Sequence, residues 1–95
     1  MPLFVVEYSY SADTATGRDE HRLAHRTWLG ELVERGTVVS SGPFADGTGA
    51  FILVEADDAP AVEALFGNDP FARGNLIADR RIVGWTPVLG SLGPR

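Results

Sequence analysis

The chain has no cysteine and no lysine among its 95 residues, and all eight of its basic side chains are arginines. Without cysteine, disulfides, thiolate nucleophiles and cysteine metal sites are excluded. Without lysine, the Schiff base that ordinary pyridoxal phosphate chemistry needs is excluded as well. We therefore expect any site in this chain to work without a cofactor.

A long apolar run and an excess of positive charge are also absent. No stretch approaches the ~20 residues that a membrane-spanning helix needs. The N-terminal stretch MPLFVVEY lacks the basic region and cleavage site of a signal peptide, so we expect a cytoplasmic protein with no membrane partner. The formal net charge of -5 argues against nucleic acid as a partner, because phosphate binding normally needs a basic patch.

What is present is the composition of a small globular domain, 44% hydrophobic and 22% charged. We expect one domain, with a structured core over about residues 3–87 and a loose tail over 89–95. The residue pattern predicts four strands, at Leu3–Tyr10, Thr37–Phe44, Ala50–Ala56 and Leu76–Val88. It predicts a long helix over Arg18–Arg35 and a second helix that begins after Asp57 or Asp58 and continues to Phe66.

The predicted order is β-α-β-β-α-β, which is typical of a ferredoxin-like α+β fold. In this fold an antiparallel sheet carries both helices on one face. No further element is predicted that would cover the other face of the sheet. We therefore expect a second copy of the chain to cover it, as a homodimer.

The first predicted helix places Arg22 and His25 on the same face as Leu29 and Leu32, at helical spacing. Since the leucines should pack on the sheet, Arg22 and His25 should point to the interior or to its edge. There they would line a pocket. The alternative is a partly buried histidine with a satisfied hydrogen bond, next to a surface arginine.

His21 and His25 are four residues apart, which is the spacing of two metal ligands on one helix face. No third ligand stands out nearby, and His21 lies some way round the helix from the face of Leu29. We therefore expect no metal.

Two further polar residues stand at the ends of predicted elements. Of Ser40 and Ser41, one must face the core, and Ser41 can donate a hydrogen bond into a pocket; alternatively, it is merely a small residue at a strand end. Asp69 precedes Pro70 and so avoids the helical region, which predicts that it ends the second helix and begins an extended bend. Phe71 would pin that bend to the body of the domain. The alternative for Asp69 is a plain loop corner.

Taken together, these motifs resemble the YCII-related (YciI-like) family. The resemblance rests on Arg22-x-x-His25, Gly42-Pro43, Asp69-Pro70-Phe71 and Trp85, and it spans about residues 3–87. The family is similar to the dimeric α+β barrel proteins, in which two sheets pack face to face. The resemblance implies a catalytic His–Asp pair, which here is His25 and Asp69.

The expected function is proton transfer on a small aromatic or carboxylated molecule, by elimination, isomerisation or lactone chemistry. His25 would be the general base or acid, Asp69 would orient it, and the two side chains would lie within hydrogen-bond reach. Arg22 would bind an anionic oxygen of the substrate, and Ser41 would be a further substrate-binding residue on the pocket wall. The alternative is a non-catalytic dimeric module that binds a small ligand or a protein partner.

Overall fold

The computed structural model describes residues 2–93 of the chain. It contains four strands, three α-helices and one 3₁₀ turn. In chain order they are β1 (Leu3–Ser9), the turn η1 (Ala12–Thr14), α1 (Ala15–Glu34), β2 (Val38–Pro43), β3 (Gly49–Glu55), α2 (Ala59–Phe66), α3 (Pro70–Arg73) and β4 (Asp79–Trp85).

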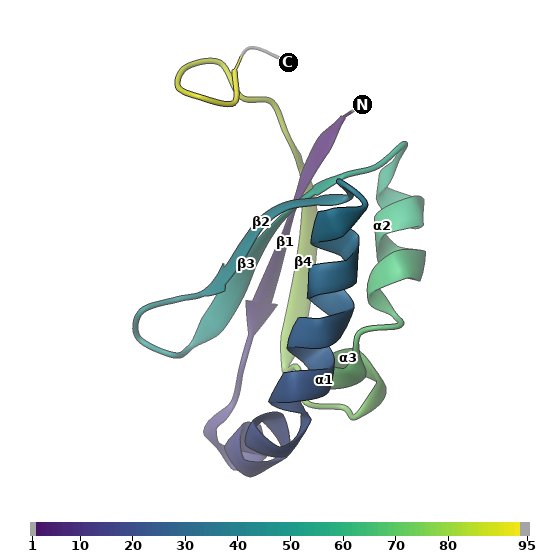
Figure 1. Cartoon of the computed structure of the whole chain (residues 1–95). Coiled ribbons are helices and arrows are strands. Elements are labelled where there is room, and N and C mark those ends of the chain that lie inside the picture. The colour runs from purple at the N-terminus through teal and green to yellow at the C-terminus, as the bar shows by residue number, and fades with distance from the viewer. Residues whose placement is uncertain (1, 94–95) are drawn as a thin grey trace.

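The four strands form one antiparallel sheet in the order β2-β3-β1-β4 (Figure 1). The first strand is central, and the strands that are neighbours in the chain, β2 and β3, form the hairpin at one side. This strand order and the β-α-β-β-α-β connectivity confirm the predicted ferredoxin-like fold.

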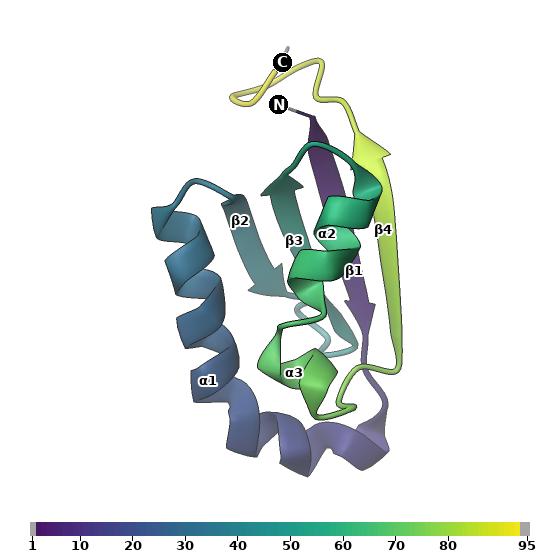
Figure 2. The ribbon, with the colours of Figure 1, turned by 90° about the vertical axis from the view of Figure 1, so that its right-hand side faces the viewer.

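The helices lie together on one face of the sheet (Figures 1 and 2), α1 toward β2 and α2 toward β4. The core lies between these layers, because alternate strand residues point toward the helices. Val6 pairs with Ile52 on one side and with Ile82 on the other. Leu29 and Leu32 of α1 bury against this row, as their helical spacing predicts.

The opposite face of the sheet carries the other set of strand residues. Val5 pairs with Leu53 and with Val83 across it, and Leu3 pairs with Trp85. Phe51, also on this face, is 39% exposed, Val83 is 38% exposed and Trp85 is 43% exposed. Several large apolar side chains thus meet solvent where no helix lies.

The structure corrects several predicted boundaries. Helix α1 begins at Ala15 rather than at Arg18, because the turn η1 leads directly into it. Strand β4 spans Asp79–Trp85 and not the longer Leu76–Val88, since only the shorter segment pairs with β1. The other three strands each differ from their predicted ends by about one residue.

The sequence predicted an extended bend beginning at Asp69. That prediction holds for Asp69 and is wrong for the residues that follow it. Asp69 is extended, with φ −59° and ψ 127°, but the next four residues form the short helix α3. Proline suits the first turn of a helix, because its missing N–H group would have no helical partner there. Pro70 therefore starts a helix at this point.

No helix or strand follows β4 within the described residues. The last two residues of the predicted tail, 94 and 95, lie outside the described residues. Across residues 2–93, no helix is long and apolar enough to span a membrane.

Candidate active site

Asp69 is placed by the junction between α2 and α3. It is the N-cap of α3, and its carboxylate oxygen Oδ1 accepts the backbone N–H of Phe71 at 2.9 Å. N-cap side chains commonly meet solvent, but this carboxylate is fully buried. Helix α3 packs against α1, which brings the cap to the buried face of the long helix.

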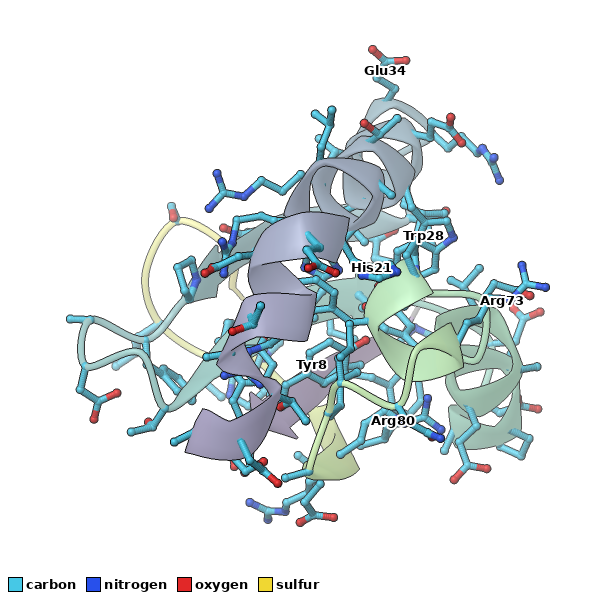
Figure 3. All side chains as sticks on the ribbon, turned by 90° about the horizontal axis from the view of Figure 1, so that it is seen from below. Tyr8, His21, Trp28, Glu34, Arg73 and Arg80 are labelled. Atoms are coloured by element: carbon cyan, nitrogen blue, oxygen red, sulfur yellow. The ribbon has the colours of Figure 1, made fainter. Side chains whose placement is uncertain are left out.

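The buried carboxylate accepts two further hydrogen bonds. The Tyr8 hydroxyl, from the central strand, donates to Oδ2 at 2.6 Å. The Nδ1 atom of His25 lies 2.7 Å from Oδ1. Three separate elements thus supply donors to Asp69, which is how a buried carboxylate is made tolerable. Figure 3 shows Tyr8 in the interior, between α1 and α3.

The imidazole of His25 is held in one orientation. Its ring stacks on Phe71, with ring centroids 3.9 Å apart and an interplanar angle of 5°. Both oxygens of the Asp69 carboxylate accept hydrogen bonds from other groups, so Nδ1 of His25 is the donor in their contact. In the neutral imidazole this leaves Nε2 without a hydrogen and able to accept one.

Nε2 of His25 opens onto a cavity. It makes no hydrogen bond with another described residue. Since every buried side-chain nitrogen or oxygen among residues 2–93 has a partner, Nε2 is accessible to solvent. His25 also lines a cavity of about 510 Å³, a size that suits a small molecule. The free nitrogen is therefore the one that a ligand in this cavity would meet.

The cavity lies between α1 and the β2–β3 hairpin. One side is apolar and is formed by aliphatic side chains of α1, by Pro43 and Ala50 of the hairpin and by the ring of Phe71. Its polar lining comes from five residues: Tyr10, Arg22, His25, Arg26 and Ser41. Two guanidinium groups and no carboxylate line it, so the cavity favours an anionic ligand.

A β-bulge decides that Ser41, and not Ser40, faces this cavity. Val38 pairs with Val54, but the register shifts before Ser40, so that Ser41 pairs with Ile52. Ile52 is fully buried under the helices. Because paired residues share a face of the sheet, Ser41 also points to the helix side.

The two arginines sit one helical turn apart on α1. Arg22 donates to the Asp19 carboxylate at 2.6 Å, and its side chain is 42% exposed. Arg26 makes no ion pair with any residue in the described part of the chain. Like charges at this spacing repel one another in the absence of an anion. A bound anion between them would relieve that repulsion.

Arg18 lies beside Tyr10 but is not among the residues that line the cavity. Arg18 is buried, and its guanidinium donates to the Thr14 hydroxyl and to the backbone carbonyls of Ser11 and Leu76. It lies 4.3 Å from the centroid of the Tyr10 ring, in a cation–π contact. This arginine thereby fixes the turn that follows β1.

Burial and the nearby carboxylate keep both tyrosines protonated. Burial raises the pKa of Tyr8 far above its usual range, and the charge of Asp69 and the hydrogen bond to it add to the rise. Burial also raises the pKa of Tyr10, again with a contribution from Asp69, while Arg18 and Arg22 oppose it. Both phenols are therefore hydrogen-bond donors at neutral pH.

His21 does not join the site. It is exposed on α1, and its Nδ1 lies 2.9 Å from the carbonyl oxygen of Gly17. The Nδ1 atom of His25 is occupied by Asp69. Within residues 2–93 there is no group of three side chains that can hold a metal ion.

The structure brings the four residues named from the sequence to one place: His25 and Asp69 in contact, Arg22 and Ser41 on the cavity wall. Three other members were missed: Tyr8, Tyr10 and Arg26. The sequence did carry patterns that point to them. Tyr8 and Tyr10 are two residues apart in the predicted strand, and Arg26 follows Arg22 by one helical turn.

Comparisons with known proteins show the family and similar folds. The sequence profile of the YCII-related domain matches residues 3–86, which confirms the family resemblance and covers most of the chain. No curated protein matches the sequence.

The similar solved structures include a dehydrochlorinase and a mycobacterial protein. The 5-chloro-2-hydroxyhydroquinone dehydrochlorinase from Burkholderia phenoliruptrix AC1100, in complex with 2,5-dihydroxybenzoquinone, has a TM-score of 0.78 and 25% sequence identity. That match covers 88% of this chain and 93% of the dehydrochlorinase chain. Rv0793 from Mycobacterium tuberculosis has a TM-score of 0.56 and 14% identity, over 98% of this chain and 100% of its own, and it shares the fold alone.

Proposed function

This chain belongs to the YCII-related family, and on that premise we propose that it is a cofactor-independent enzyme that moves a proton on a small anionic, aromatic or quinonoid molecule. The reaction class is elimination or isomerisation. The observation that carries the proposal is the 2.7 Å contact between His25 and Asp69, which leaves Nε2 of His25 facing the cavity.

In the proposed mechanism, Nε2 of His25 takes a proton from the substrate and later returns one. Imidazole suits this task, because it exchanges protons near neutral pH. The Asp69 carboxylate holds the ring by Nδ1 and stabilises the imidazolium while it carries the extra proton. Tyr8 and the Phe71 N–H hold the carboxylate in turn. Stacking on Phe71 keeps the ring from rotating.

The substrate class follows from the cavity and from the relative. Arg22 and Arg26 supply positive charge on the cavity wall, and the aromatic ring of Phe71 and the aliphatic side chains supply an apolar surface. The similar dehydrochlorinase was solved with a dihydroxybenzoquinone. A planar molecule with acidic hydroxyl groups fits both kinds of wall.

The proposal is tested by exchange of carbon-bound protons. A panel of acidic phenols, hydroxyquinones and unsaturated lactones is incubated with the protein in D₂O, and loss of each C–H signal is followed by proton NMR. The parent protein should accelerate exchange for members of the panel. His25→Gln should lower that rate by about 100-fold or more, which is the usual contribution of a general base.

His21→Gln is the matched control, since it removes the other histidine of the same helix and should leave the rate unchanged. Exchange that survives in His25→Gln would contradict the assigned base. A parent protein that binds panel members without exchanging any proton would favour the non-catalytic binding module instead.

We further propose that the active form is a homodimer with the sheets face to face. The support is the apolar face opposite the helices, where Phe51, Val83 and Trp85 remain partly exposed. Light scattering should report a dimer at micromolar concentration, and Val83→Glu should produce a folded monomer. A monomeric parent protein would count against this assembly.

A further inference from the structure

The two tyrosines of the site end in different places. Tyr8 belongs to β1 and Tyr10 follows it just past the strand end; the Tyr10 ring lies on the helix side, since it contacts both Tyr8 and Phe71. The Tyr8 hydroxyl is committed to Asp69 at 2.6 Å. The Tyr10 hydroxyl makes no hydrogen bond with any described residue, although Tyr10 lines the cavity. Since no buried polar side-chain atom in residues 2–93 is left without a partner, this hydroxyl is accessible to solvent.

The ring of Tyr10 is fixed although its hydroxyl is free. Its edge-to-face contact with Phe71 has a centroid distance of 6.1 Å and an interplanar angle of 80°. The Arg18 guanidinium covers one side of the ring at 4.3 Å. Its backbone N–H donates to the Thr48 carbonyl at 2.8 Å. A donor held in this way needs no reorganisation when a ligand arrives.

Tyr10 is also close to the groups that the proposed chemistry uses. Phe71 touches both rings, since it stacks on His25 and meets Tyr10 edge on. The charges of Arg22 and Asp69 both act on the Tyr10 phenol. Tyr10, Arg22 and His25 all line the same cavity.

We propose that Tyr10 is a substrate-contacting residue whose hydroxyl donates a hydrogen bond to an anionic oxygen of the ligand, next to Arg22. This inference rests on the proposed function. When Nε2 of His25 removes a proton from carbon, the electron pair of the broken C–H bond moves onto the conjugated carbonyl oxygen. Tyr10 and Arg22 stabilise the resulting oxyanion, and the pair returns when a proton is restored.

The test compares the parent protein with Tyr10→Phe, using 2,5-dihydroxybenzoquinone as the probe. Its acidic hydroxyls make it an anion in neutral solution, and its colour allows a direct absorbance titration. The variant keeps the ring, and with it the contacts to Arg18 and Phe71. Its dissociation constant for the probe should rise by about 10-fold to 100-fold, the usual effect of losing a hydrogen bond to a charged group.

Two controls separate this effect from indirect ones. Thr48→Val removes a hydroxyl from the nearby hairpin loop, outside the cavity, and should leave probe affinity unchanged. For the neutral probe 2,5-dimethoxybenzoquinone, the dissociation constant should rise by less than about threefold in Tyr10→Phe, because hydrogen bonds to neutral acceptors are weaker. Thermal melts followed by circular dichroism verify that each variant is folded.

Failure of this inference can be told from failure of the proposed function. Equal probe affinity in the parent protein and Tyr10→Phe overturns the role of Tyr10 and leaves the role of His25 standing. Tyr10-dependent binding by a protein that exchanges no proton supports Tyr10 and contradicts the role of His25 in catalysis. A parent protein that does not bind the probe contradicts both.

Discussion

The buried face of α1 has two halves that are built differently. Toward its C-terminal end, Leu29 and Leu32 pack into an apolar core. Toward its N-terminal end, the buried residues are Arg18 and His25, held by carbonyls and by the carboxylate of Asp69. Apolar packing stabilises a fold without directing any one atom, whereas a buried polar network stabilises only if its members are all positioned.

The difference shows where this small domain accepts a cost in stability. Burying Asp69, His25 and Arg18 removes polar groups from water, and hydrogen bonds offset that loss. A core made only of leucines would serve folding equally well. The polar half leaves a nitrogen of His25 and the hydroxyl of Tyr10 facing the cavity, and this is what an apolar core cannot provide.

Removing the centre of the polar half should have the largest effect. Asp69→Ala leaves the Tyr8 hydroxyl, the Phe71 N–H and Nδ1 of His25 without their acceptor. We expect unfolding in urea to show a loss of about 3–5 kcal/mol. Proton exchange on the panel should also fall to the level of His25→Gln. A variant that keeps the parent exchange rate would show that the carboxylate does not position the base.

The apolar half should respond differently. Leu32→Ala creates a cavity in the core and should lower the free energy of unfolding by about 2–5 kcal/mol. Where the variant is folded, its dissociation constant for 2,5-dihydroxybenzoquinone should match that of the parent protein. If probe binding weakened along with stability, the two halves would not be separate in function.

A milder change in the polar half is Tyr8→Phe, which removes one hydrogen bond to Asp69 and keeps the ring. The expected loss in the free energy of unfolding is about 1–3 kcal/mol, because the acceptor is charged. The exchange rate should fall with it, since the carboxylate is less firmly held. Loss of stability with an unchanged rate would make Tyr8 a packing residue only.

Alkaline pH should lower the free energy of unfolding through Tyr8, a residue of the polar half. The ordinary pKa of tyrosine is 10.0, and burial raises that of Tyr8 in the folded chain. Above pH 10 the unfolded chain releases the phenol proton while the folded chain keeps it. Stability is therefore complete below pH 10 and falls above it, by roughly 1 kcal/mol for each pH unit from Tyr8.

Urea unfolding at a series of pH values measures this slope, and Tyr8→Phe should reduce it. The chain has no lysine, so no ammonium group titrates in the same range. Tyrosinate absorbance that develops fully before the protein unfolds would contradict the buried, neutral phenol.

Much of the fold could be predicted from the sequence because its elements have clear periods and breaks. A short run rich in β-branched and aromatic residues marks β1, and leucines at helical spacing mark α1. Boundaries were less certain where local signals conflict. The rule that a residue before proline avoids the helical region held for Asp69 but could not show that Pro70 itself would start a helix.

The site was predictable only in part, because its members meet through tertiary packing. His25 and Asp69 were identified through family motifs, and their contact spans 44 residues of sequence. Tyr8 lies 61 residues from Asp69 and has the pattern of an ordinary core residue of a strand. Ser41 rather than Ser40 faces the cavity because of a bulge in β2, and the sequence around the bulge does not predict it.

The most direct test is to determine which nitrogen of His25 carries the hydrogen. Nitrogen-15 NMR of the imidazole rings in mildly alkaline solution distinguishes the two neutral tautomers, and His21→Gln assigns the remaining signals to His25. The hydrogen bond to Asp69 predicts a hydrogen on Nδ1 and a bare Nε2, and Asp69→Asn should abolish that preference. A parent protein with the hydrogen on Nε2 would contradict the account, because the atom facing the cavity could not then accept a proton.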